Sequence, residues 1–197
     1  MKTFLKYVVA GICVLAFLPL SAQKRSFSEC EMRLNMLFSH LKRDTVAENK
    51  RCINDSIYDV FSEILQHEVS LEYDFKNTAG LKKVVSSDKH IAVYSWCYVV
   101  DGERLAFNGV VQRRAKGMEV YPLKSQLEAY VPTDNQVIDA ENWYGALYFD
   151  IFPFRSKQGK TYVLLGWSQN NRYLTMKTID VLWFDNGPIR SGHLLES

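Results

Sequence analysis

Two aspartates that interrupt apolar, strand-like runs are the leading candidates for chemistry in this sequence. Asp150 lies within YFDIF and Asp180 within TIDVL. A carboxyl group held against apolar surface has a raised pKa, which suits an acid or a base. Two such groups on paired strands, roughly 5–9 Å apart, would suit hydrolysis of a glycosidic bond. Because polar residues alternate normally along half-exposed strands, the pattern favours aspartates that face solvent or accept backbone N–H groups.

A polar segment between two strand-like runs is the best candidate for binding. Aromatic rings exposed beside such a loop can stack on a sugar or grip a peptide. Aromatic residues make up 13% of the chain and also favour strands, so most of them are expected in a sheet core. The candidate binding residues are Trp167, Ser168, Asn170, Asn171 and Tyr173.

Two familiar catalytic patterns are incomplete. Ser168, Asp185 and His193 follow the chain order of an α/β-hydrolase triad, but the serine lacks the helix that must follow it. His67-Glu68 begins like a zinc-protease motif, but Leu71 stands where the second histidine is required. The sequence therefore predicts no metal site and no cofactor.

The first 22 residues are typical of a secretory signal peptide. Lys2 and Lys6 precede an uncharged run from Tyr7 to Leu20, and Ser21-Ala22 then offers a cleavage site before Gln23. The run is shorter than the roughly 20 residues that span a membrane, which disfavours an uncleaved anchor. We expect export to the periplasm, the outer envelope or the extracellular space, with no membrane-spanning segment after cleavage.

Charge excludes one class of partner. Two of the 24 basic residues lie in the signal segment, so the remainder carries as many basic as its 22 acidic residues. Proteins that bind nucleic acids usually carry a basic excess, so this protein is not expected to bind nucleic acid.

Export permits disulfides, but a bridge between Cys30 and Cys52 is not expected. The helical register separates the two residues by roughly 9 Å, whereas the Cα atoms of a disulfide lie within ~7 Å of each other.

The remaining chain divides into a helical part, residues 23–70, and a strand-rich part, residues 71–197. Met32, Met36 and Leu41 recur at helical spacing, and Thr45 with Glu48 forms a capping box that would start a second helix near a turn at Asp44. The sequence predicts a helical hairpin that buries one stripe.

Six or seven strands follow. The apolar run 91–100, Asp101-Gly102 and the run 104–113 predict a hairpin. Further strands are expected at 118–123, 143–154, 160–167, 174–184 and 188–190. No long helices alternate with them, which favours an α+β fold with an antiparallel meander. The helices are expected to cover one face of the sheet.

Several elements of the strand-rich part resemble an uncharacterised family of secreted proteins typical of Bacteroidota. They are EYDF, SSDKHIAVYSW, NWYGALYFDIFPF and TYVLLGWSQNNRYLTMKTIDVLWFDNGPI. The resemblance implies export and a β-rich fold, and no catalytic residues, because the family has no established activity. Relatives commonly carry an aspartate at the position of Ser168 and further strands beyond Gly192. If no later strand covers residues 174–184, that edge invites self-association or an envelope partner.

The sequence thus favours an exported, non-enzymatic binding or interaction module. The alternative is a hydrolase of glycans or peptides that uses Asp150 and Asp180. A third possibility, a lipid-carrying barrel, requires a closed sheet with a hollow interior.

Overall fold

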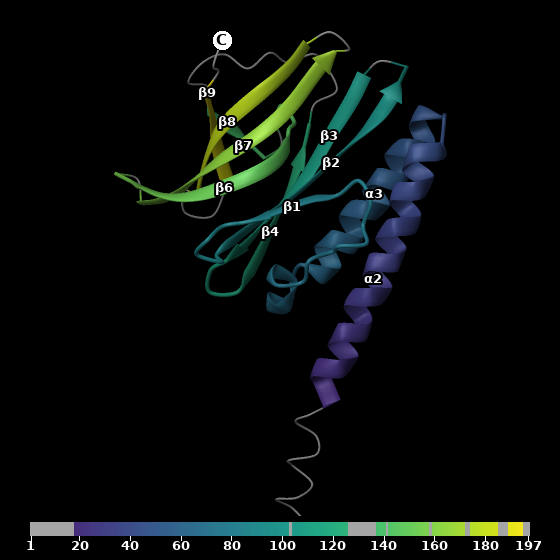
Figure 1. The fold of residues 1–197 in the computed structure, drawn as a ribbon, viewed down its shortest axis with the longest axis horizontal. Coiled ribbons are helices and arrows are strands. Elements are labelled where there is room, and N and C mark those ends of the chain that lie inside the picture. Colours follow the sequence, from purple (N-terminus) through teal and green to yellow (C-terminus); the bar gives the residue numbers. More distant parts are fainter. Residues whose placement is uncertain are drawn as a thin grey trace, which may run out of the picture.

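The computed structural model describes residues 18–194 except 103, 126–136, 141, 158, 172–173 and 185–188. Side chains are described from Phe27 onward, apart from those of residues 137–139, 170–171, 174 and 189–194. The described elements form three layers (Figure 1): a pair of helices, a four-stranded sheet and a five-stranded sheet. All strand pairs within the two sheets are antiparallel. The predicted α+β fold, a helical hairpin followed by antiparallel strands, is confirmed.

The helical layer consists of α2 (Leu18–Arg43) and α3 (Ala47–Ile64), which run side by side (Figure 1). None of the helices in the described ranges combines the length and the apolar character needed to cross a membrane.

The buried stripe of α2 differs from the predicted one. Met32 and Met36 are 59% and 60% exposed. Leu41, the third predicted residue, is buried as expected, but it lines up with Phe27 and Leu34 at a spacing of seven residues. Both stripes fit the helical period, so periodicity alone could not select between them. The stripe that carries the phenyl ring and two leucines is the one that packs on α3 and the sheet.

The predicted capping box of α3 does not form. Val46 is the N-cap residue, and no side chain caps the helix there. Instead, the Val46 amide donates to Asp44 Oδ1 at 2.8 Å, and Asn49 Nδ2 donates to Asp44 Oδ2 at 3.2 Å. The Val46 hydrogen bond holds the pKa of the Asp44 carboxyl below its usual value. An Asx-type turn thus replaces the capping box.

The central layer is the four-stranded sheet, in the order β1-β2-β3-β4. Its strands are β1 (Lys82–Val85), β2 (Ile91–Asp101), β3 (Arg104–Arg114) and β4 (Met118–Lys124). Alternate residues of β2 face the helices, and the others face the second sheet. The ten-residue apolar run is therefore a strand that is covered on both faces, not a half-exposed one.

The outer layer is the five-stranded sheet, in the order β5-β9-β8-β7-β6. Its strands are β5 (Val137–Asp139), β6 (Leu147–Ser156), β7 (Gly159–Asn171), β8 (Leu174–Phe184) and β9 (Ile189–Leu194). The condition for an open edge at residues 174–184 is not met, because β9 pairs with β8 and β5 pairs with β9. The edge strands of this sheet are β5 and β6, and β6 is the one that pairs with β7.

Buried polar side chains tie the helices to the central sheet. Trp96 Nε1 donates to Asn54 Oδ1 at 2.8 Å, and Asn54 Nδ2 donates to Asn108 Oδ1 at 2.9 Å. Tyr58 donates to the Leu123 carbonyl at 2.6 Å. Each buried donor finds a partner on another element, so these bonds fix how α3 sits across β2 and β3.

Candidate functional site

The two candidate catalytic aspartates do not share a cleft. Asp180 pairs with Leu164 of β7, whereas Asp150 pairs with the next residue, Leu165. Cross-strand partners share a face and neighbours along a strand alternate, so the two carboxylates lie on opposite faces of the sheet. Asp150 is exposed and accepts the Ile151 amide at 2.9 Å.

Asp180 instead belongs to a buried hydrogen-bond network. It is fully buried and accepts hydrogen bonds from the hydroxyls of Tyr144 and Tyr148, the latter at 2.7 Å. Trp143 Nε1 in turn donates to the Tyr148 hydroxyl at 3.0 Å. Burial, and then the nearby negative charge of Asp180, raise the pKa of Tyr148 well above its usual value. These contacts join the segment before β6 to β8 inside the core.

The candidate binding segment is mostly strand rather than loop. β7 runs to Asn171, and Ser168 pairs with Met176 and is only 2% exposed. Trp167 is half-buried, and its ring packs edge-on against Phe107 at 5.7 Å between centroids. The side chains of Asn170 and Asn171, and the whole of Tyr173, lie outside the described residues.

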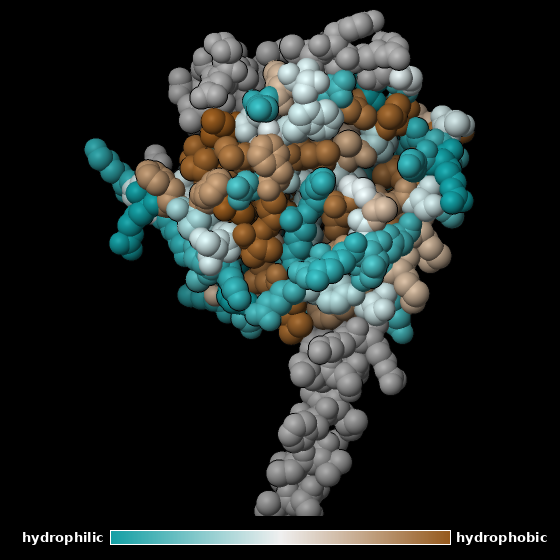
Figure 2. Space-filling model, viewed as in Figure 1, coloured by the Kyte–Doolittle hydropathy of each residue, from teal (hydrophilic) through white to brown (hydrophobic). Residues whose placement is uncertain are grey.

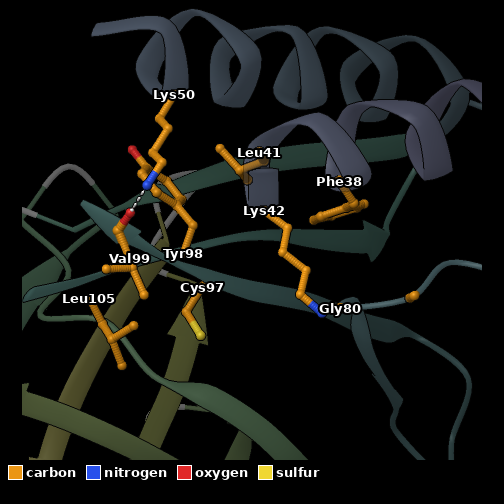
Figure 3. Close-up of a pocket in the computed structure, with 10 residues that line it drawn as sticks. Phe38, Leu41, Lys42, Lys50, Gly80, Cys97, Tyr98, Val99 and Leu105 are labelled. Carbon is orange, nitrogen blue, oxygen red and sulfur yellow. Dashed lines mark hydrogen bonds between the residues drawn. The ribbon is translucent and has the colours of Figure 1, made fainter. Parts of the chain in front are cut away.

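A cavity that the sequence did not indicate lies between the two helices and the open edge of β2. β1 covers β2 only from Ala92 to Ser95, so the same edge of β2 is open beyond that point. The cavity has a volume of about 360 Å³. Its lining residues come from α2, α3, the loop before β1, β2 and β3 (Figure 3): Phe38, Leu41, Lys42, Lys50, Ala79, Gly80, Cys97, Tyr98, Val99 and Leu105.

One wall of this cavity is the loop before β1, which α2 holds in place. Glu31 accepts the Tyr73 hydroxyl at 2.5 Å and the Asn77 amide at 2.8 Å, and Asn35 accepts the Ala79 amide at 3.3 Å. Gly80 has a φ of +95°, a conformation that favours glycine, and lies against Phe38. The wall is therefore positioned by the same helix that supplies Phe38 and Leu41.

The opposite wall is the open edge of β2. The Ser86 amide bonds to the Ile91 carbonyl, so the odd-numbered main-chain groups of β2 point toward the β1 side. Cys97 and Val99 continue that series beyond the end of β1. Lys50 Nζ reaches across from α3 and donates to the Val99 carbonyl at 2.6 Å (Figure 3). This lysine thus takes the place of a strand neighbour for one edge carbonyl.

The polar groups of the cavity are few. Lys50 is only 7% exposed, whereas Lys42 is exposed and extends toward Gly80 (Figure 3). Cys97 is half-buried, and burial raises the pKa of its thiol. Cys30 is half-buried on α2 and Cys52 is exposed on α3, and the structure holds no disulfide bond between them. Within the described ranges, no three His, Cys, Asp or Glu side chains are grouped to hold a metal ion.

A second feature is an apolar surface on the outer sheet. Phe149, Phe152 and Phe154 of β6 are 56%, 48% and 56% exposed. Val163 pairs with Phe152, and Val181 pairs with Val163, so these three side chains lie on the same face of the sheet. Figure 2 shows hydrophobic surface gathered over β6, β7 and β8.

The edge of β6 is poorly suited to adding another strand. The Ile151 amide is taken by the Asp150 carboxylate, and two residues on, Pro153 has no N–H to offer. Amides two residues apart point to the same side, and a proline is tolerated in a strand where its nitrogen faces away from the ladder. The exposed phenyl face, rather than the strand edge, is the available contact surface.

No family model, curated protein or solved structure matches the chain.

Proposed function

We propose that this protein is an exported binding module that takes a small, largely apolar ligand into the cavity at the open edge of β2. One observation carries the proposal. A volume of about 360 Å³, lined mainly by apolar side chains with few polar groups, lies between a helix and an incomplete strand edge. Small-molecule sites are typically concave and apolar, with a few polar groups that orient the ligand.

The hydrolase alternative has no observation in its favour. An acid–base pair needs two carboxylates on one cleft. Asp180 is fully buried and Asp150 lies on the other face of the outer sheet. The described residues that line the cavity include no carboxylate. Export, and membership of the secreted Bacteroidota-type family, remain proposals that rest on the signal-like N-terminus and on the motifs of the strand-rich part.

The position of Cys97 gives a direct test. A ligand that fills the cavity should slow alkylation of the Cys97 thiol, whereas Cys52, exposed on α3, provides an internal reference. We expect 1-octanol, a neutral apolar probe, to slow labelling of Cys97 alone, as measured by mass spectrometry of the peptides.

Two variants sharpen this test. Leu105→Trp should fill the cavity and abolish the protection, whereas Val85→Trp, outside the cavity, should leave it unchanged. Equal labelling rates of Cys97 with and without the probe, together with no heat of binding, would count against the proposal.

We also propose that the self-association expected from the sequence uses the phenyl face of β6, in place of the β8 edge. The exposed rings of Phe152 and Phe154 support this choice. Large contiguous apolar patches on the surface of a protein mark interaction sites.

A further inference from the structure

The charge inside the cavity is of one sign. Among the described residues that line the cavity, Lys42, Lys50, the Cys97 thiol and the Tyr98 phenol are titratable, and none is an Asp or Glu. Among the residues that the structure describes, neither lysine forms an ion pair. Asp44, the acidic neighbour whose pKa Lys50 influences, is occupied by the Val46 amide and Asn49.

The ammonium group of Lys50 has donors to spare. A lysine ammonium carries three N–H donors. One donates to the Val99 carbonyl at 2.6 Å, and the described residues supply no second acceptor. The residue as a whole is 7% exposed, its bond to Val99 is part-buried, and it lines the cavity, so a ligand there can reach the other two donors. A buried cation without a compensating anion is costly, so a ligand that brings an anion gains more here than on the surface.

The rest of the cavity is apolar. Phe38 and Leu41 of α2 form one side, and Leu105 of β3 forms another (Figure 3). A ligand that satisfied Lys50 would therefore have to place an apolar body against these three side chains. A phosphate or a sugar has no such body, whereas a chain or ring that ends in a single carboxylate does.

We propose that the cavity binds an apolar monocarboxylate, with its carboxylate on Lys50 and its apolar body against Phe38, Leu41 and Leu105. Lys42, exposed at the rim, adds a second positive charge at the entrance. This inference rests on the proposed function, because it names the ligand class of the same cavity. An acyl chain and the carboxyl terminus of an apolar peptide share this chemistry.

Calorimetry on the purified protein tests the inference with matched probes. Octanoate and 1-octanol have the same chain length and differ in the head group. We expect octanoate to bind about tenfold or more tightly, because a charge-assisted hydrogen bond is stronger than a neutral one. N-acetyl-Leu-Leu and its C-terminal amide form a second pair, and the tighter of the two acids identifies an acyl or a peptide source.

Lys50→Met keeps the length of the side chain and should abolish the preference for the acid. Lys82→Met, an exposed lysine on β1, should leave it unchanged. If Lys50→Met fails to fold, Lys42→Met replaces it, because that side chain is exposed; it should reduce the preference, as should added salt.

The outcomes separate the two proposals. Equal affinity for acid and alcohol would overturn the carboxylate inference but leave a binding cavity in place. An acid preference that survives in both Lys50→Met and Lys42→Met would also overturn it. No binding of either probe, with no protection of Cys97, would overturn the inference and the proposed function together.

Discussion

Gly145 packs so closely against Phe107 that alanine should not fit. A Cβ atom at this position would lie 2.5 Å from Phe107 Cβ and 3.2 Å from Ser125 Cβ. Its φ of +95° adds a second difficulty, because side chains rarely adopt that conformation. Gly145 precedes β6 and brings the Tyr144–Tyr148 segment against β3, so the contact lies between the two sheets.

A matched control separates the two effects. Gly159, the first residue of β7, has a φ of +109°, and nothing lies within 4 Å of a Cβ built there. Gly159→Ala should therefore cost only the backbone strain, about 1–2 kcal/mol, partly offset by the reduced entropy of the unfolded chain. Gly145→Ala carries the same strain and also an overpacking cost of about 1–3 kcal/mol.

We expect Gly145→Ala to lower the free energy of unfolding by about 2–5 kcal/mol and Gly159→Ala by about 1–2 kcal/mol. Urea unfolding followed by tryptophan fluorescence measures both, because Trp143 and Trp96 are buried in the two cores. If the two variants lost equal stability, within about 0.5 kcal/mol, then Phe107 would not be held against this glycine and the packing between the sheets would be wrong.

Three other predictions can be tested with the same preparations. Asp180→Ala should lower the free energy of unfolding by about 2–5 kcal/mol, because the buried hydroxyls of Tyr144 and Tyr148 lose this acceptor. Asp150→Ala, on the surface, should lower it by less than about 1 kcal/mol. Equal urea midpoints of the two variants would contradict this. Burial lowers the pKa of Lys83 to about 8, so the unfolded chain binds more protons above that pH, and stability should rise from pH 8 to 9.5 in the wild type relative to Lys83→Met; parallel pH profiles of the two proteins would refute it. Replacing Phe152 and Phe154 by serine should reduce any concentration-dependent rise in scattered light, and a wild type that stays monomeric throughout would remove the proposed self-association.

The local signals in the sequence predicted much of the fold. The turn at Asp44, the Asp101-Gly102 hairpin and the apolar strands all appear within a few residues of their expected positions. β1 was missed because Lys-Lys-Val-Val is short and half charged, and β5 because it has only three residues. The division into two sheets could not be predicted, since periodicity shows which residues alternate but not which sheet covers them.

The site was harder to predict than the fold, for reasons that particular residues make plain. Asp150 and Asp180 each interrupt an apolar run, but only the register of β7 decides that they face opposite ways. The cavity depends on where β1 stops, on a glycine in a loop and on a lysine that reaches from α3 to β2. None of these relations is local in sequence, so no motif could signal them.

Lys50 links the stability of the fold to the chemistry proposed for the cavity. An open strand edge leaves main-chain groups without partners, and burying them uncompensated is costly. Here the Val99 carbonyl is satisfied by an ammonium in place of another strand. A strand would have closed the edge and consumed its donors, whereas an ammonium keeps two donors and a positive charge. At this edge Lys50 therefore takes the place that a further strand would occupy. The two N–H donors and the positive charge that it keeps are the groups that would hold the proposed carboxylate.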